Sequence, residues 1–62
     1  MPISGKEMLK RYLKAGWELA RVTGSHHQVR KDGQIETIPV HGNHDLGKGL
    51  ERALLKRLEE IK

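Results

Sequence analysis

The hydrophobic residues of the first quarter of the chain recur with the period of a helix. They fall three and four positions apart, at Met8, Leu9, Tyr12 and Leu13. At 100° per residue these positions share one face, which is the pattern of an amphipathic α-helix. The letters SGKE at residues 4–7 form a capping box, in which the Ser4 hydroxyl accepts from the Glu7 amide. With Gly16 as a C-terminal stop, the pattern predicts a helix from about Gly5 to Ala15.

Three short β-strands are predicted next, at Trp17–Val22, His26–Arg30 and Ile35–Val40. Thr23-Gly24 separates the first two strands and Asp32-Gly33 the last two. Asp-Gly between such runs is a strong hairpin signal, because both central residues of a type I′ turn need positive φ. Pro39 lacks an amide proton, which favours a place at the edge of the sheet. Trp17 is placed either to stack a base or to close the first helix against the sheet.

A second amphipathic helix is predicted in the letters LERALLKRLEEIK, residues 50–62. Its apolar face consists of Leu50, Leu54, Leu58 and Ile61, with Leu55 on the flank. The order α-β-β-β-α predicts an α+β fold, as one domain over residues 1–62. We expect a three-stranded antiparallel sheet with both helices on one face and with the other face open to solvent.

The Asp32-Gly33 turn sets the register of the second and third strands. The pairs that follow are Lys31 with Gln34, Val29 with Glu36, His27 with Ile38 and His26 with Pro39. Because paired residues share a face, His27 is predicted on the apolar, helix-facing side and His26 on the open side. If Thr23-Gly24 is also a two-residue turn, Arg21 lies directly opposite His26. A slip of one residue reverses every one of these assignments.

The adjacent residues His26 and His27 are the candidates for proton transfer, because imidazole exchanges protons near neutrality. On the open side, Arg21 and Arg30 would surround His26 with cations that suit a phosphate, and Gln28 shares that face. The ordinary alternative for His26 is an exposed histidine without a role. For His27 it is a half-buried histidine that is hydrogen-bonded to the backbone.

Other kinds of site fit the sequence less well. The candidate metal ligands are His26, His27, His41, His44 and Asp45, but they match no recognised zinc spacing, and the first two are predicted on opposite faces. Ser25 beside a histidine on an extended strand does not form a nucleophile–base pair. The letters GNHDLGKG lack the preceding strand and the GK[ST] ending of a phosphate-binding loop. We therefore expect no metal and no cofactor.

The charge of the chain favours an anionic partner. Twelve lysines and arginines against eight acids give a net charge of +4, and nucleic acid suits such a chain because neutralised phosphates release counterions. A net charge of about 2–8 is also ordinary for solubility. Lys6, Lys10 and Lys14 form a stripe that is either solvated or a track for phosphates. The sequence has no cysteine, so we expect no disulfides. It has no apolar run that would suit a membrane span or a signal peptide, so we expect a cytoplasmic protein without membrane contact.

The sequence resembles the HicA toxins, the small mRNA interferases of toxin–antitoxin pairs. The matching pieces are LKRYLKAGW, RVTGSHHQVRKDG, TIPVHGN and the leucine-rich helix after Gly49, which together cover nearly the whole chain. The resemblance implies a fold like that of double-stranded-RNA-binding domains. It implies metal-independent cleavage of mRNA until a HicB-like antitoxin occludes the toxin. It also implies a catalytic histidine within GSHH, which we assign to His26, on the open face, with His27 as the second candidate.

The mechanism that we expect uses the 2′-hydroxyl of the RNA as nucleophile, one imidazole for proton transfer and cations to stabilise the phosphate. The sequence does not reveal a second proton carrier. The residues expected to contact RNA are Gly24, Ser25, Arg21, Gln28, Arg30, Lys31, Lys6, Lys10 and Lys14. Two alternatives stay open: a module that binds double-stranded RNA without cleaving it, and a purely structural partner of another protein.

Overall fold

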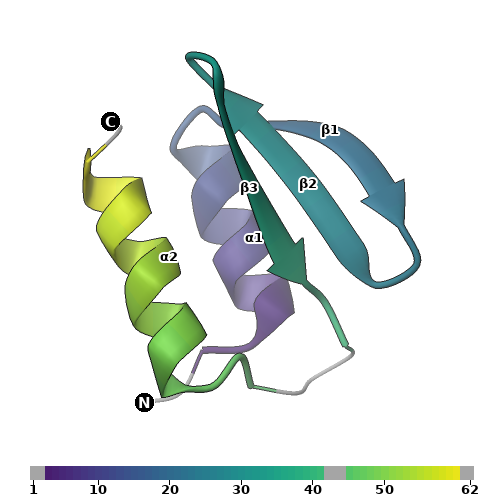
Figure 1. Ribbon diagram of the computed structural model, residues 1–62, viewed down its shortest axis with the longest axis vertical. Helices are drawn as coiled ribbons and strands as arrows, with labels where there is room; N and C mark the ends of the chain where they lie inside the picture. Colours follow the sequence, from purple (N-terminus) through teal and green to yellow (C-terminus); the bar gives the residue numbers. More distant parts are fainter. Residues whose placement is uncertain (1–2, 42–44, 61–62) are drawn as a thin grey trace.

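The computed structural model describes residues 3–41 and 45–60, and it confirms the predicted α+β fold. The elements in chain order are α1 (Gly5–Lys14), β1 (Glu18–Thr23), β2 (His26–Lys31), β3 (Gln34–Pro39) and α2 (Lys48–Glu60). The strands form one antiparallel sheet in the order β1-β2-β3. Both helices pack side by side on one face of this sheet (Figure 1). None of the described helices is long and apolar enough to cross a membrane.

Helix α1 begins and ends with the signals expected from the sequence. The Ser4 hydroxyl accepts from the Glu7 amide at 3.2 Å, as in a capping box. Gly16 adopts a φ of 99°, which allows the amide of Trp17 to bond back to the carbonyl of Tyr12 at 3.0 Å. At its start the helix lies directly against the sheet, because a Cβ at Gly5 would overlap the carbonyl oxygen of Pro39.

The register of β2 against β3 is the predicted one, including His27 opposite Ile38 and His26 opposite Pro39. Asp32 and Gly33 both have positive φ, at 50° and 80°, as the type I′ turn requires. Strand β3 is an edge strand, which confirms the prediction from Pro39.

The predicted position of Arg21 opposite His26 is wrong. Thr23 pairs with His26, and Arg21 pairs with Gln28. The physical reason is that Gly24, with a φ of 59°, opens a turn made of Gly24 and Ser25, so that Thr23 remains in β1. Arg21 nevertheless stays on the open face, since His26 and Gln28 are two residues apart on β2.

The core lies between the helices and the sheet. It consists of Ile3, Met8, Tyr12, Trp17, Val29, Ile38 and Leu54. The Tyr12 hydroxyl donates to the carbonyl oxygen of Leu54 at 2.6 Å, which joins the two helices inside the core. Trp17 is 2% exposed and packs edge-on against Tyr12, with ring centroids 4.9 Å apart. Of its two predicted roles, Trp17 therefore closes α1 against the sheet, and it is not available to stack a base.

Helix α2 is held to the sheet by its apolar face and by an ion pair. Leu54 is buried, and Leu55 and Leu58 pack against the core. Leu50 remains partly exposed, and Ile61 lies outside the described residues. The Arg57 guanidinium contacts the Glu36 carboxylate at 3.0 Å and so connects α2 to β3.

Candidate active site

The two adjacent histidines begin β2 and lie on opposite faces of the sheet, as predicted. His26 is exposed on the open face, in a cross-strand row with Thr23 and Pro39. His27 is half-buried on the helix-facing side, in a row with Val22 and Ile38. The buried neighbours of this row, Val29 among them, identify that side as the one covered by the helices.

The ring of His27 is fixed by the backbone of the preceding turn. Its Nδ1 lies 3.3 Å from the carbonyl oxygen of Ser25. Because a carbonyl oxygen can only accept, this contact favours the tautomer of the neutral ring that has its proton on Nδ1 and its lone pair on Nε2. The same Ser25 oxygen also accepts from the amide of Val40 at 2.7 Å, which ties the turn to the end of β3. This arrangement is the one a proton acceptor needs, because the ring is oriented and its second nitrogen is left to react.

His26 has no comparable support. Its ring is exposed, and within residues 3–41 and 45–60 no hydrogen bond orients it. Arg21, Gln28 and Arg30 share its face, as expected from their alternation along the strands. Arg30, however, stands four residues along β2 from His26, which is about 13 Å in an extended strand. Of the two arginines, only Arg21 lies close to the histidine end of the sheet.

The predicted RNA-binding lysines divide between two places. Lys31 is on the helix-facing side, where its ammonium donates to the carbonyl oxygen of Ala15 at 2.7 Å and so caps the end of α1. Lys6, Lys10 and Lys14 form an exposed stripe on α1. Lys6 lies in the first turn, beside the Gly5 contact with β3, and therefore at the same end of the sheet as His27.

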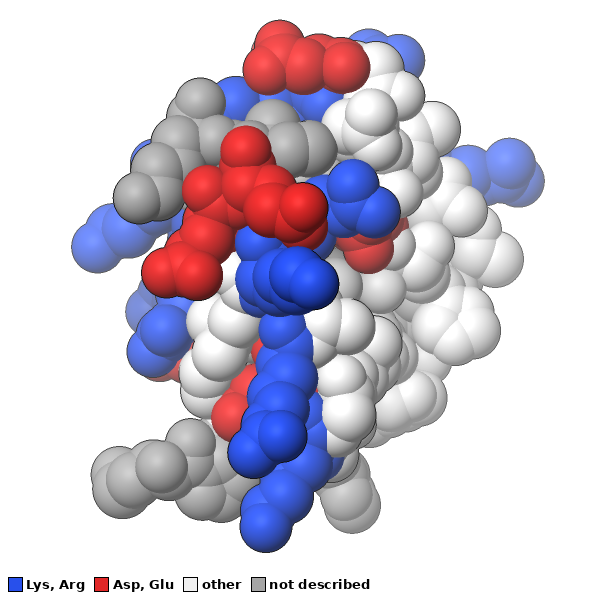
Figure 2. Space-filling model, turned by 60° about the vertical axis from the view of Figure 1, so that its left-hand side comes forward, with Lys and Arg blue, Asp and Glu red and all other residues white. Residues whose placement is uncertain are grey.

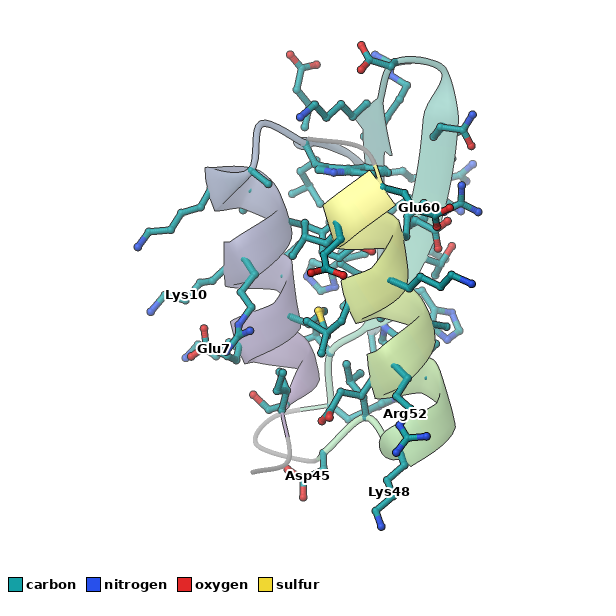
Figure 3. The ribbon with its side chains drawn as sticks, turned by 90° about the vertical axis from the view of Figure 1, so that its left-hand side faces the viewer. Glu7, Lys10, Asp45, Lys48, Arg52 and Glu60 are labelled. Carbon is teal, nitrogen blue, oxygen red and sulfur yellow. The ribbon has the colours of Figure 1, made fainter. Side chains whose placement is uncertain are left out.

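A second basic row on α2 was not singled out from the sequence. Lys48, Arg52 and Lys56 are exposed and spaced by four residues, which is the same signal that revealed the row on α1. Lysine and arginine side chains form a column on this side of the molecule (Figure 2). Lys10 extends outward from α1, and Lys48 and Arg52 extend outward from α2 (Figure 3).

The candidate metal ligands are not brought together by the part of the chain that the structure describes. Within residues 3–41 and 45–60, no three side chains of the types His, Cys, Asp and Glu converge. His26 and His27 diverge across the sheet, and His41 is exposed after β3. His44 lies outside the described residues. This region offers proton transfer by one oriented imidazole rather than a ligand cluster.

Comparisons with known proteins identify relatives of this chain. A family model described as the HicA toxin of bacterial toxin–antitoxin systems matches residues 5–59. The probable mRNA interferase HicA of Pseudomonas fluorescens is 38% identical to this chain over 50 residues. The match covers 79% of this chain and 83% of that protein. The family match at residues 5–59 runs from the start of α1 through all but the last residue of α2 and therefore includes both histidines.

Proposed function

This chain belongs to the HicA toxin family of bacterial toxin–antitoxin systems, and from that premise we propose that it is a toxin that cleaves messenger RNA in the cytoplasm. The relative in Pseudomonas fluorescens carries the name of an mRNA interferase. The positive charge of +4 suits a polyanionic substrate. The observation that carries the proposal is the oriented ring of His27, because RNA cleavage without a bound metal requires a placed proton acceptor.

In the proposed reaction, Nε2 of His27 takes the proton of a 2′-hydroxyl. The oxygen attacks the adjacent phosphorus, the bond to the 5′-oxygen of the next nucleotide breaks, and a 2′,3′-cyclic phosphate remains. The leaving oxygen takes up a proton from water or from the protonated imidazole. Lys6 is the cation at this end of the sheet that we assign to the phosphate, whose negative charge grows during the attack, because Arg21 lies on the open face with His26.

Our choice of His27 differs from the sequence-based preference for His26, which remains a prediction. Exposure alone favours His26, since a long substrate reaches the open face without obstruction. The hydrogen bond to Ser25 favours His27, because a general base must be held in one tautomer and one orientation. The two rings lie on opposite faces and cannot act on the same phosphate as a base and an acid.

Two matched variants decide between the histidines. His27→Asn keeps an amide donor near the position of Nδ1 but has no Nε2, so we expect cleavage to fall by about 10²–10⁴-fold. His26→Asn is expected to cleave within a few-fold of the unchanged protein. The assay uses purified protein, single-stranded RNA and a chelator, and it detects fragments that end in cyclic phosphate. If His26→Asn lost cleavage activity and His27→Asn kept it, the catalytic residue would be His26 on the open face.

Further controls test the chemistry itself. Loss of cleavage in chelator would refute the metal-free reaction, and cleavage of RNA that carries 2′-deoxy sugars at the cut site would refute attack by the 2′-hydroxyl. Salt-dependent retention of double-stranded RNA without fragments at any pH would support the alternative of a non-catalytic binding module. Unfolding curves for each variant show whether lost activity reflects a lost fold.

We further infer that a HicB-like antitoxin silences the toxin by covering the His27 end of the sheet or by placing acidic segments along the Lys6, Lys10 and Lys14 row. Membership of a toxin–antitoxin family supports the existence of a partner, and the charge of the exposed lysines supports an acidic one. Co-expression with the protein encoded by the neighbouring gene should yield a complex without cleavage activity. A complex that cleaves RNA as fast as the free toxin would contradict this inference.

A further inference from the structure

Strand β1 contains a bulge that places two apolar side chains on the same face. Leu19 pairs with Val29 and Arg21 pairs with Gln28, so Ala20 is the extra residue. Leu19 and Val22 are three residues apart, and in a regular strand they would point to opposite faces. Because the bulge adds one residue between them, both share the helix-facing side, Leu19 with Val29 and Val22 with His27.

The helices do not cover this pair of side chains. All six residues of β1 are exposed, whereas Val29 on β2 and Ile38 on β3 are fully buried beneath the helices. Leu19 is 48% exposed and Val22 is 50% exposed. The helix layer lies over β2 and β3 and leaves β1 at the far side of the sheet (Figure 1). We refer to Leu19 and Val22 together as the apolar shelf.

The apolar shelf lies directly beside the proposed catalytic ring. Val22 is the cross-strand partner of His27, and side chains so paired have Cβ atoms about 4.5–5.5 Å apart. Leu19 continues the shelf along β1, away from the Gly24-Ser25 turn. A nucleotide whose sugar and phosphate contact Nε2 of His27 therefore has apolar surface within reach of its base.

Neither the tyrosine nor the tryptophan of this chain offers a platform for that base. Single-stranded nucleic acid is usually held by stacking on aromatic side chains. This chain contains one tyrosine, one tryptophan and no phenylalanine. Tyr12 is fully buried and Trp17 is 2% exposed, so both belong to the core. Beside His27 on the helix-facing side, the exposed side chains of β1 that can contact the face of a base are the aliphatic ones of the shelf.

We propose that the apolar shelf of Leu19 and Val22 binds the nucleobase next to the scissile phosphate. This inference rests on the proposed function and names a substrate subsite for it. Two aliphatic side chains contact the face of a base and not its hydrogen-bonding edges. The shelf therefore holds a purine or a pyrimidine through desolvation, and it contributes to binding before the reaction rather than to the chemical step.

The test compares two strand variants of matched chemistry. Leu19→Thr/Val22→Thr removes the apolar surface with residues that suit a β-strand. Ile35→Thr makes the same change on β3, where the side chain is 58% exposed on the opposite face. We expect the double variant to raise KM for single-stranded RNA by about tenfold with little change in kcat. Ile35→Thr should leave both values unchanged. A double variant with the KM of the unchanged protein would refute the proposal that the shelf binds a base.

An abasic substrate makes the test specific to the base. After the cut site has been mapped on one RNA, an abasic nucleotide is placed on either side of it. At one of these positions the missing base should lower kcat/KM of the unchanged protein about tenfold. The double variant, which lacks the shelf, should have the same kcat/KM on the abasic RNA as on the intact RNA. Equal losses for both proteins would show that the base is bound elsewhere.

A binding experiment separates the failure of the shelf from the failure of the proposed function. The affinity of the His27→Asn protein for the same RNA is measured with and without the shelf substitutions. Weaker binding supports the shelf even if the unchanged protein cuts no RNA, in which case the cleavage proposal alone fails. Unchanged RNA binding, with loss only of self-association or of antitoxin binding, would assign the shelf to a protein and refute our inference.

Discussion

The hydroxyl of Tyr12 should make the stability of the fold depend on pH in the alkaline range. Burial raises its pKa from the ordinary 10.0 to about 12, with a further rise from the Glu36 carboxylate and an opposing effect of the Arg57 guanidinium. The hydroxyl donates to the carbonyl oxygen of Leu54 at 2.6 Å, and an ionised oxygen cannot make that bond. Folding therefore favours the protonated side chain.

The sign and the size of the effect follow from linkage. The folded-state pKa is the higher one, so the contribution is fully present below about pH 10 and is lost as the pH rises through about 12. A shift of two pKa units corresponds to about 3 kcal/mol of unfolding free energy. Removing the hydroxyl in Tyr12→Phe should destabilise the fold by about 1.5 kcal/mol near neutrality.

These two magnitudes predict that the stability curves of the two proteins cross. The unchanged protein loses about 1.4 kcal/mol by about pH 11, so the Phe variant should equal it there and exceed it at higher pH. Urea unfolding at a series of pH values measures both curves, and the lysines that also titrate in this range are common to both proteins. Tyr12 is the only tyrosine, so the absorbance of tyrosinate reports its pKa directly. Parallel curves or a pKa near 10 would refute the reasoning.

Two further predictions concern the contacts around the sheet. Gly5→Ala should destabilise the fold by about 1–3 kcal/mol, because a Cβ there overlaps the backbone at the end of β3. Gly49→Ala, in the first turn of α2 with nothing within 4 Å of its Cβ, should instead stabilise the fold by up to about 0.5 kcal/mol. Thermal unfolding of the two variants checks both values, and equal effects would contradict the close approach at Gly5. Glu36→Gln should lower the pKa of Tyr12, because it removes a negative charge, and Arg57→Gln should raise that pKa, because it removes a positive one. Absorbance titration of tyrosinate in each variant measures both shifts, and two shifts of the same sign would contradict this prediction.

The sequence determined one hairpin of the sheet well and the other poorly, for a physical reason. Asp32-Gly33 offers a single pair of residues that tolerate positive φ, so the register of β2 and β3 could be counted outward from it. The stretch Thr23-Gly24-Ser25 offers two possible turns around the same glycine, and the structure uses the second. The bulge at Ala20 has no signature in the letters ELARVT, since they contain no glycine, the residue that often marks a bulge.

For the candidate site, sequence reasoning placed the histidines on the correct faces but could not show how either ring is held. The face of each residue follows from alternation along β2, which is local. The partner of His27 is the backbone oxygen of Ser25, and any residue type at position 25 carries such an oxygen. Its direction depends on the turn and on the amide of Val40, which are properties of the fold.

The bulge at Ala20 also affects whether copies of this chain can associate through the edge strands of their sheets. An edge strand with an uninterrupted ladder of backbone groups invites another strand to add to it. Here one rim of the sheet is broken at Ala20, and the other ends at Pro39, which has no amide proton to offer. The same irregularity that brings Leu19 and Val22 to one face of β1 thus opposes the addition of a further strand at the edge where this apolar surface lies.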